Sequence, residues 1–153
     1  MSAFASQARW VLAQLPVADK ANEITAIPQL LALLDLSGAK ITIDAAGWQK
    51  KIAGQIIEGG ADYVLALKEN HPQLYEDVSL WLSSEFDAGH LQTLETVEKD
   101  HGRIETRRYA LSDQLDWLEG RQEWAGLSAL GLVESRRERG GIRSAIFCVQ
   151  ALT

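Results

Sequence analysis

Two strand-like runs, each followed by a helical pattern, limit the fold of this chain more than any other feature. Residues 40–47 are rich in β-branched side chains and include the carboxylate Asp44, and residues 62–68 are nearly all apolar. Between them, residues 49–58 place isoleucines at helical spacing, and residues 72–86 form a longer pattern of the same kind. This order predicts a βαβ unit with two parallel strands and a right-handed connection. The predicted fold class is therefore α/β.

The residues before this unit predict one short strand and one helix. Residues 9–16 are predicted to form a strand that ends at Pro16, and the opening residues are its expected hairpin partner. Residues 23–36 repeat apolar side chains at helical spacing, and Asn22 can cap them. Pro28 lies too deep for the first turn of a helix capped there, so a later start of the helix is an alternative.

The second half of the chain changes character. Its residues alternate as antiparallel strands do, with a turn near His101 and another near Gly140 and Gly141. The predicted strands are residues 91–97, 103–111, 130–135 and 145–151, and residues 117–124 predict a short helix or turn. A length of 153 residues is typical of one domain. We therefore predict a single unit over residues 1–153, with an α/β part at 1–88 and mainly antiparallel strands at 89–153.

Charge and composition exclude several classes of protein. The formal net charge is −6, which argues against a dedicated basic nucleic-acid module, although not against an enzyme that touches DNA with one face. The basic excess lies after residue 98 and is mostly arginine, the side chain suited to bidentate phosphate contacts. Cys148 is the single cysteine, which excludes an internal disulfide and favours the reducing cytoplasm. No apolar run approaches the roughly 20 residues of a membrane span, so we expect no membrane partner.

Asp44 is the sharpest candidate for a functional residue. A carboxylate at the carboxyl end of a buried strand points toward the crevice where α/β sheets place their ligands. The small residues 45–47 leave room beside it for a metal ion or a substrate. The same residue could instead cap the helix that begins near Gln49. The spacing alone leaves both interpretations open.

The second candidate is the segment from His101 to Arg108. On a strand, Arg103, Glu105 and Arg107 share one face, because side chains repeat every two residues. Two guanidinium groups around one carboxylate could hold a phosphate, or they could form a solvated salt-bridge ladder, which is the safer interpretation of the pattern alone. His101 reads as a polar turn residue.

Several blocks of this sequence, taken together and in order, resemble bacterial insertion-sequence transposases of the subgroup that includes the H-repeat-associated proteins. The resemblance covers essentially the whole chain. The blocks are Ser2-Ala3-Phe4-Ala5, Lys20-Ala21-Asn22-Glu23-Ile24, Thr42-Ile43-Asp44-Ala45, Gly60-Ala61-Asp62-Tyr63-Val64-Leu65-Ala66-Leu67-Lys68 and His101-Gly102-Arg103-Ile104-Glu105-Thr106-Arg107.

The resemblance implies a ribonuclease H-like DDE catalytic domain that cuts and joins DNA at insertion-sequence ends. In such domains three carboxylates hold two divalent ions, usually Mg²⁺, which activate the attacking oxygen and stabilise the leaving oxygen. The second of these carboxylates maps to Asp44, which becomes the expected metal ligand. The resemblance also points to DNA as the partner of the basic segment, through His101, Arg103, Arg107 and Arg108.

The chain also departs from the family pattern. The first aspartate of the family lies before the Ser-Ala-Phe-Ala block, and its acidic third member lies in a helix beyond Thr153. Glu105 could be proposed as the third carboxylate, although its strand-like setting favours contact with DNA or support of other site residues. We therefore expect an inactive fragment that binds no stable Mg²⁺ pair. The alternative is a domesticated, non-catalytic remnant that binds DNA or oligomerises.

The implied fold also predicts association. In ribonuclease H-like sheets the strand with the first aspartate is central, and this chain has its two neighbours without it. Either residues 4–15 close against Ile41, Thr42 and Ile43, or backbone groups stay open for another chain. We expect a homo-oligomer formed through the N-terminal strands.

Overall fold

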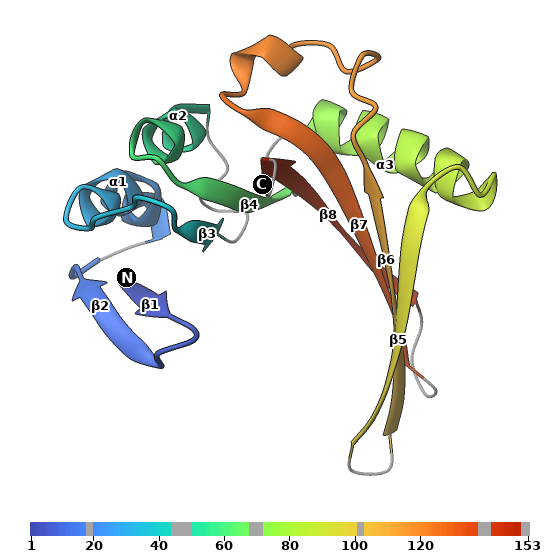
Figure 1. The fold of residues 1–153 in the computed structure, drawn as a ribbon, viewed down its shortest axis with the longest axis horizontal. Coiled ribbons are helices and arrows are strands. Elements are labelled where there is room, and N and C mark those ends of the chain that lie inside the picture. Colours follow the sequence, from blue (N-terminus) through green and yellow to red (C-terminus); the bar gives the residue numbers. More distant parts are fainter. Residues whose placement is uncertain (18–19, 44–49, 68–71, 101–102, 138–141, 151–153) are drawn as a thin grey trace.

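The computed structural model describes residues 1–17, 20–43, 50–67, 72–100, 103–137 and 142–150. Within these residues six strands form one sheet in the order β3-β4-β8-β7-β6-β5, while β1 and β2 form a separate hairpin (Figure 1). The strands are β1 (Ser2–Ala5), β2 (Trp10–Gln14), β3 (Lys40–Ile43), β4 (Asp62–Leu67), β5 (Gln92–Asp100), β6 (Arg103–Ser112), β7 (Leu127–Arg137) and β8 (Ile142–Gln150). The helices are α1 (Lys20–Leu31), α2 (Lys50–Glu58), α3 (Pro72–Asp87) and the short 3₁₀ helix η2 (Arg121–Glu123).

The predicted βαβ unit is present. Strands β3 and β4 are parallel, with Ile41 beside Tyr63 and Ile43 beside Leu65, and α2 connects them. Along β4, Tyr63, Leu65 and Leu67 are buried on one face, while the residues between them are half-buried. Burial of one full face and part of the other explains why β4 reads as a nearly continuous apolar run. The α/β class is therefore confirmed, together with the parallel pairing.

Helix α1 differs from the prediction at both ends. It begins at Lys20 and ends at Leu31, rather than spanning residues 23–36, and it contains Pro28. The chain leaves the helix through tighter turns, in which the amides of Leu33 and Leu34 donate to the carbonyls three residues earlier. Pro28 is tolerated inside the helix because the face around it is buried. Among the side chains that are described in this helix, from Thr25 onward, the buried ones are Ala26, Ile27, Leu30 and Leu31.

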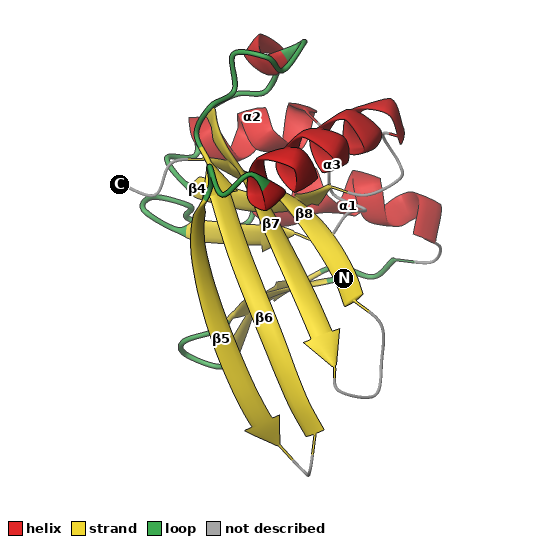
Figure 2. Cartoon of the chain, turned by 90° about the vertical axis from the view of Figure 1, so that its right-hand side faces the viewer, coloured by secondary structure: helices red, strands yellow, loops and turns green. Residues whose placement is uncertain are grey.

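The second half forms an antiparallel meander, as predicted, but its strands are longer. Strands β5, β6, β7 and β8 pair in succession, and β8 also pairs antiparallel with β4. This last pairing, in which Leu65 lies beside Cys148, joins both halves of the chain in one sheet. The helices gather at one end of the sheet, and the far ends of β5, β6 and β7 extend beyond them (Figure 2). These extensions carry polar residues, which apolar periodicity cannot predict.

The segment between β6 and β7 covers the core at the helical end. Residues 117–124 contain the single turn of η2, in agreement with the predicted short helix or turn. Leu115, Leu118 and Trp124 are buried there. The Tyr63 hydroxyl donates to the carbonyl of Ala125 over 2.9 Å, which fastens this segment to β4.

The N-terminal hairpin is the least integrated part of the described structure. Strands β1 and β2 are antiparallel, which confirms the predicted hairpin. Among the described residues they pair only with each other, and β3 has β4 as its one neighbour. Of the two expected arrangements, the described residues therefore show the open one, in which residues 4–15 do not close against β3.

Helix α3 provides a test of the core. Leu82 is fully buried against the sheet, whereas Leu80 is 72% exposed on the same helix. We expect Leu82→Ala to lower the free energy of unfolding by about 2–5 kcal/mol, because a buried leucine leaves a cavity. Leu80→Ala is the matched control and should change it by less than about 0.5 kcal/mol. Urea unfolding followed by tryptophan fluorescence measures both, and equal effects would contradict this packing.

Candidate functional site

The position of Asp44 is fixed only by its neighbours in the chain. Strand β3 ends at Ile43, and Asp44 itself lies outside the described residues, as do residues 45–49. The strand end is nevertheless informative, because β3 runs parallel to β4 and their carboxyl ends meet at one edge of the sheet. Such an edge is where open α/β sheets place ligands. Both interpretations of Asp44, as helix cap and as metal ligand, stay predictions.

The turn between β5 and β6 carries two further candidates. His101 lies outside the described residues. Arg103 begins β6 and pairs with Asp100 along the backbone, but its side chain also lies outside the described part of the structure. Asp100 pairs with Arg103, and in the same register Glu98 lies directly opposite Glu105.

Glu105 and Arg107 lie side by side on one face of β6, as their spacing predicts. The Arg107 Nε donates to Glu105 Oε1 over 3.0 Å, and its Nη1 lies 3.4 Å from Glu98 Oε2. From β7, the Ser135 hydroxyl donates to the same Glu105 Oε1 over 2.7 Å. Arg107 thus sits between two carboxylates that would repel each other across the strands.

Hydrogen bonds and nearby negative charges raise the pKa of Arg107. The hydrogen bond to Glu105 is the main cause that raises the pKa of the Arg107 guanidinium, followed by a hydrogen bond to Tyr109 and the charges of Glu105 and Glu98. The Glu105 side chain is only 20% exposed. A partly buried, charge-assisted network of this kind is geometrically specific, whereas an isolated exposed pair contributes little.

Arg108 points to the opposite face of β6, because it is the next residue along the strand. Its Nε donates to Glu95 Oε2 over 2.7 Å, and both side chains are about half exposed. This hydrogen bond is the main cause that raises the pKa of Arg108. The structure therefore brings Glu105 and Arg107 together and separates Arg108 from them.

Sequence reasoning missed the partners that come from neighbouring strands. Glu98 and Glu95 on β5 contact Arg107 and Arg108, and Ser135 on β7 donates to Glu105. The signal for the β5 residues was present, because a two-residue turn at 101–102 implies that residues 98 and 105 are paired. No comparable signal locates Ser135, since its register depends on the long connection between β6 and β7.

The described residues contain no group of three or more His, Cys, Asp or Glu side chains that could hold a metal ion. Glu105 Oε1 already accepts two hydrogen bonds, one from a guanidinium and one from a hydroxyl. A Mg²⁺ ion requires several oxygen ligands in near-octahedral geometry. The described carboxylates therefore do not fit a Mg²⁺ site by themselves.

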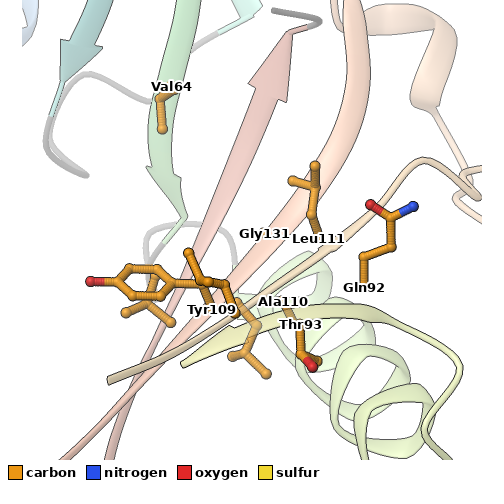
Figure 3. A pocket seen from close by; sticks show the side chains of 10 residues that line it. Val64, Gln92, Thr93, Tyr109, Ala110, Leu111 and Gly131 are labelled. Carbon is orange, nitrogen blue, oxygen red and sulfur yellow. The ribbon is translucent and has the colours of Figure 1, made fainter. Parts of the chain in front are cut away.

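An apolar pocket of about 380 Å³ lies along the strands of the large sheet. Its lining comes from β4, β5, β6 and β7 and includes Val64, Leu94, Tyr109, Leu111 and Gly131 (Figure 3). Among the residues of this lining that the structure describes, Tyr109 is the one titratable side chain. In the part of the chain that the structure describes, no helix is long and apolar enough to cross a membrane.

Comparison with known families gives the class of this protein. The family model described as "Transposase DDE domain" matches residues 2–141. The chain therefore belongs to the DDE transposase family, which confirms the resemblance found in the sequence blocks. No solved structure matches the chain significantly.

Individual relatives agree with the family assignment. The chain is 50% identical over 141 residues to an "Uncharacterized protein in dhlA 3'region" of Xanthobacter autotrophicus, covering 92% of this chain and 48% of that protein. It is 39% identical over 150 residues to the "Putative transposase YncI" of Escherichia coli O157:H7, covering 95% and 38%. It is 37% identical over 139 residues to the "H repeat-associated putative transposase YhhI" of Escherichia coli K12, covering 90% and 37%. The chain spans less than half the length of each of these relatives.

The network around Glu105 predicts unequal costs for two glutamate substitutions. Glu105→Ala leaves the Arg107 Nε and the Ser135 hydroxyl without their acceptor, so we expect it to lower the free energy of unfolding by about 1–3 kcal/mol. Glu95→Ala removes an exposed partner of Arg108 and should cost at most about 1 kcal/mol. Urea unfolding of the two variants measures the difference. A cost for Glu95→Ala that equals or exceeds that of Glu105→Ala would refute the structural role of this network.

Proposed function

We propose that this chain is part of the catalytic domain of a DNA transposase, with a ribonuclease H-like arrangement of its α/β part. The observation that carries the proposal is the family match over residues 2–141, combined with a parallel strand pair whose β3 member ends one residue before Asp44. In this proposal Asp44 is the second acidic residue of the metal-binding triad. The substrate is DNA at insertion-sequence ends.

The metal in this proposal is Mg²⁺, which would activate the attacking oxygen and stabilise the leaving oxygen. Asp44 would be its ligand, at the shared carboxyl edge of β3 and β4. Glu105 takes a different role. Its bonds to Arg107 and Ser135 favour a positioning residue that orients Arg107, rather than the third carboxylate of the triad.

With Asp44 as its one assigned ligand, the 153-residue chain does not carry out strand transfer in this proposal. Two Mg²⁺ ions need several oxygen ligands, and one carboxylate supplies two at most. The alternative is a domesticated remnant that binds DNA or oligomerises without catalysis. Translation of the genomic DNA on both sides of this reading frame separates the two: encoded Asp and Glu blocks indicate a truncated transposase, and unrelated sequence favours a remnant.

The proposed DNA surface is the arginine-bearing ribbon of β6 and β7. Arg107 and Arg108 lie on opposite faces of it, and Arg136 is exposed on β7. Glu98 and Glu95 partly balance the positive charges of Arg107 and Arg108, so little positive charge remains for DNA phosphates. This balance supports weak binding that depends on salt and not on DNA sequence.

Salt titration of DNA binding tests this surface. The plot of log affinity against log salt has a slope of about 0.9 per phosphate neutralised, and we expect a shallow slope with binding lost near physiological salt. Replacing Arg103 and Arg107 together by alanine should lower both the affinity and the slope. Arg121→Ala is the control, because Arg121 lies in η2 and pairs with Asp116. An unchanged slope in the double variant would place the DNA contact elsewhere.

A further inference from the structure

The segment that joins β6 to β7, residues 113–126, is fixed near its C-terminal end. It lies at the end of the sheet where the helices gather (Figure 2). Trp124 is only 6% exposed, and the carbonyl of Ala125 accepts the hydrogen bond from Tyr63 of β4. Glu123 directly precedes these two residues in the chain, so its backbone is attached to the core.

From this fixed position Glu123 contacts the first residue of α2. Its Oε2 forms an ion pair with the Nζ of Lys50. The same Nζ lies 5.8 Å from the centroid of the Trp124 ring, within the range of a cation–π interaction. Both charged side chains are about half exposed, and a pair with this exposure adds little to the stability of a whole protein. Its effect is therefore local, on the position of the first turn of α2.

The first turn of α2 lacks the charge that normally stabilises the start of a helix. It contains no acidic side chain and begins with Lys50 and Lys51. Positive side chains are unfavourable at this end, because the helix dipole is positive there. Ile52 and Ala53 are fully buried and anchor the inner side of the turn. Glu123 supplies the missing negative charge on the outer side, from a distant part of the sequence.

The start of α2 is also one end of the connection that carries Asp44. Strand β3 ends at Ile43 and α2 begins at Lys50, so residues 44–49 join the two elements. A connection of this length can span up to ~20 Å when extended. The end of β3 alone therefore does not determine where the connection runs, and the position of Lys50 is the second constraint on it.

We propose that Glu123 is a positioning residue, which through Lys50 fixes the start of α2 and thereby the placement of Asp44. This inference rests on the proposed function, in which Asp44 is an acidic residue of the site. It also assigns a role to the 113–126 segment. Because β6 and β7 flank this segment, it links the arginine-bearing ribbon to the element that follows Asp44.

Nuclear magnetic resonance of the 153-residue protein, without metal or DNA, tests the proposal. The main readout is the side-chain carboxyl resonance of Asp44, which a merely stabilising contact would leave unchanged. We expect Glu123→Lys to shift this resonance, because two positive charges then face each other at the start of α2. The double variant Lys50→Glu/Glu123→Lys restores an ion pair of the same net charge, and it should return the resonance toward its wild-type position.

Asp116→Lys is the matched control for the charge change. Asp116 is an exposed acidic residue of the same segment, but it pairs with Arg121 and not with α2. This variant should leave the Asp44 resonance in place. A second readout is hydrogen exchange of the Gly54 amide, which in an α-helix donates to the carbonyl of Lys50. Glu123→Lys should accelerate this exchange about two- to fivefold, as expected for the loss of an exposed ion pair.

An Asp44 resonance that Glu123→Lys leaves unchanged overturns the proposal, even if the Gly54 amide exchanges faster. So does an equal shift in Asp116→Lys, or a shift that the double variant does not reverse. If circular dichroism shows that Glu123→Lys is unfolded, Glu123→Gln replaces it and should shift the resonance in the same direction. Since no metal is added, a failure of Asp44 to bind metal leaves this result unaffected, and the two failures are distinguishable.

Discussion

The antiparallel pairing of β4 with β8 is the constraint on which the rest of this structure depends. Strand β4 has the parallel strand β3 on one side and β8 on the other, so it is held along both edges. Its buried side chains Tyr63, Leu65 and Leu67 provide the surface on which α2 and α3 pack. Because β8 is the last described strand, the fold closes only when the end of the chain returns to the middle of the sheet. This strand pairing, together with the hydrogen bond from Tyr63 to Ala125, positions the meander of β5, β6 and β7 and its charged network relative to β4.

The charged network changes how the arginine-rich segment should be understood. A sequence with alternating arginine and glutamate on one strand face is compatible with phosphate binding or with a structural ladder. The contacts of Arg107 with Glu105, Glu98 and Tyr109 show that its charge is already used within the protein. DNA would have to compete with these glutamates, and its attraction to the remaining positive charge would weaken as salt screens that charge. Under the proposed function, a DNA contact at this surface would therefore be weak and non-specific.

Local patterns predicted most elements, and long-range contacts account for what they missed. Isoleucines at helical spacing identified α2, and the apolar run at residues 62–68 identified β4, because burial alone determines those patterns. The predicted C-terminal end of α1 was wrong because Leu34 and Leu36 continue the apolar spacing beyond Leu31, where the chain instead forms tighter turns. The extensions of β5 and β6 beyond their apolar parts are stabilised by pairing with each other, which no single-strand pattern reveals. Within the candidate site, the proximity of Glu105 and Arg107 followed from strand alternation, whereas the contact with Ser135 required the register of β7.

The proposal that Asp44 is a ligand of a divalent metal at the shared end of β3 and β4 is tested most directly by paramagnetic broadening with Mn²⁺. Mn²⁺ takes the oxygen ligands that Mg²⁺ takes and detects even weak binding through the NMR signals of nearby backbone amides. The account predicts selective broadening of the amides of Ile43 and Leu67, the last residues of the two parallel strands, and its loss in Asp44→Asn. Broadening that is centred on Glu98 and Glu105 instead, or that persists at Ile43 in Asp44→Asn, would contradict it.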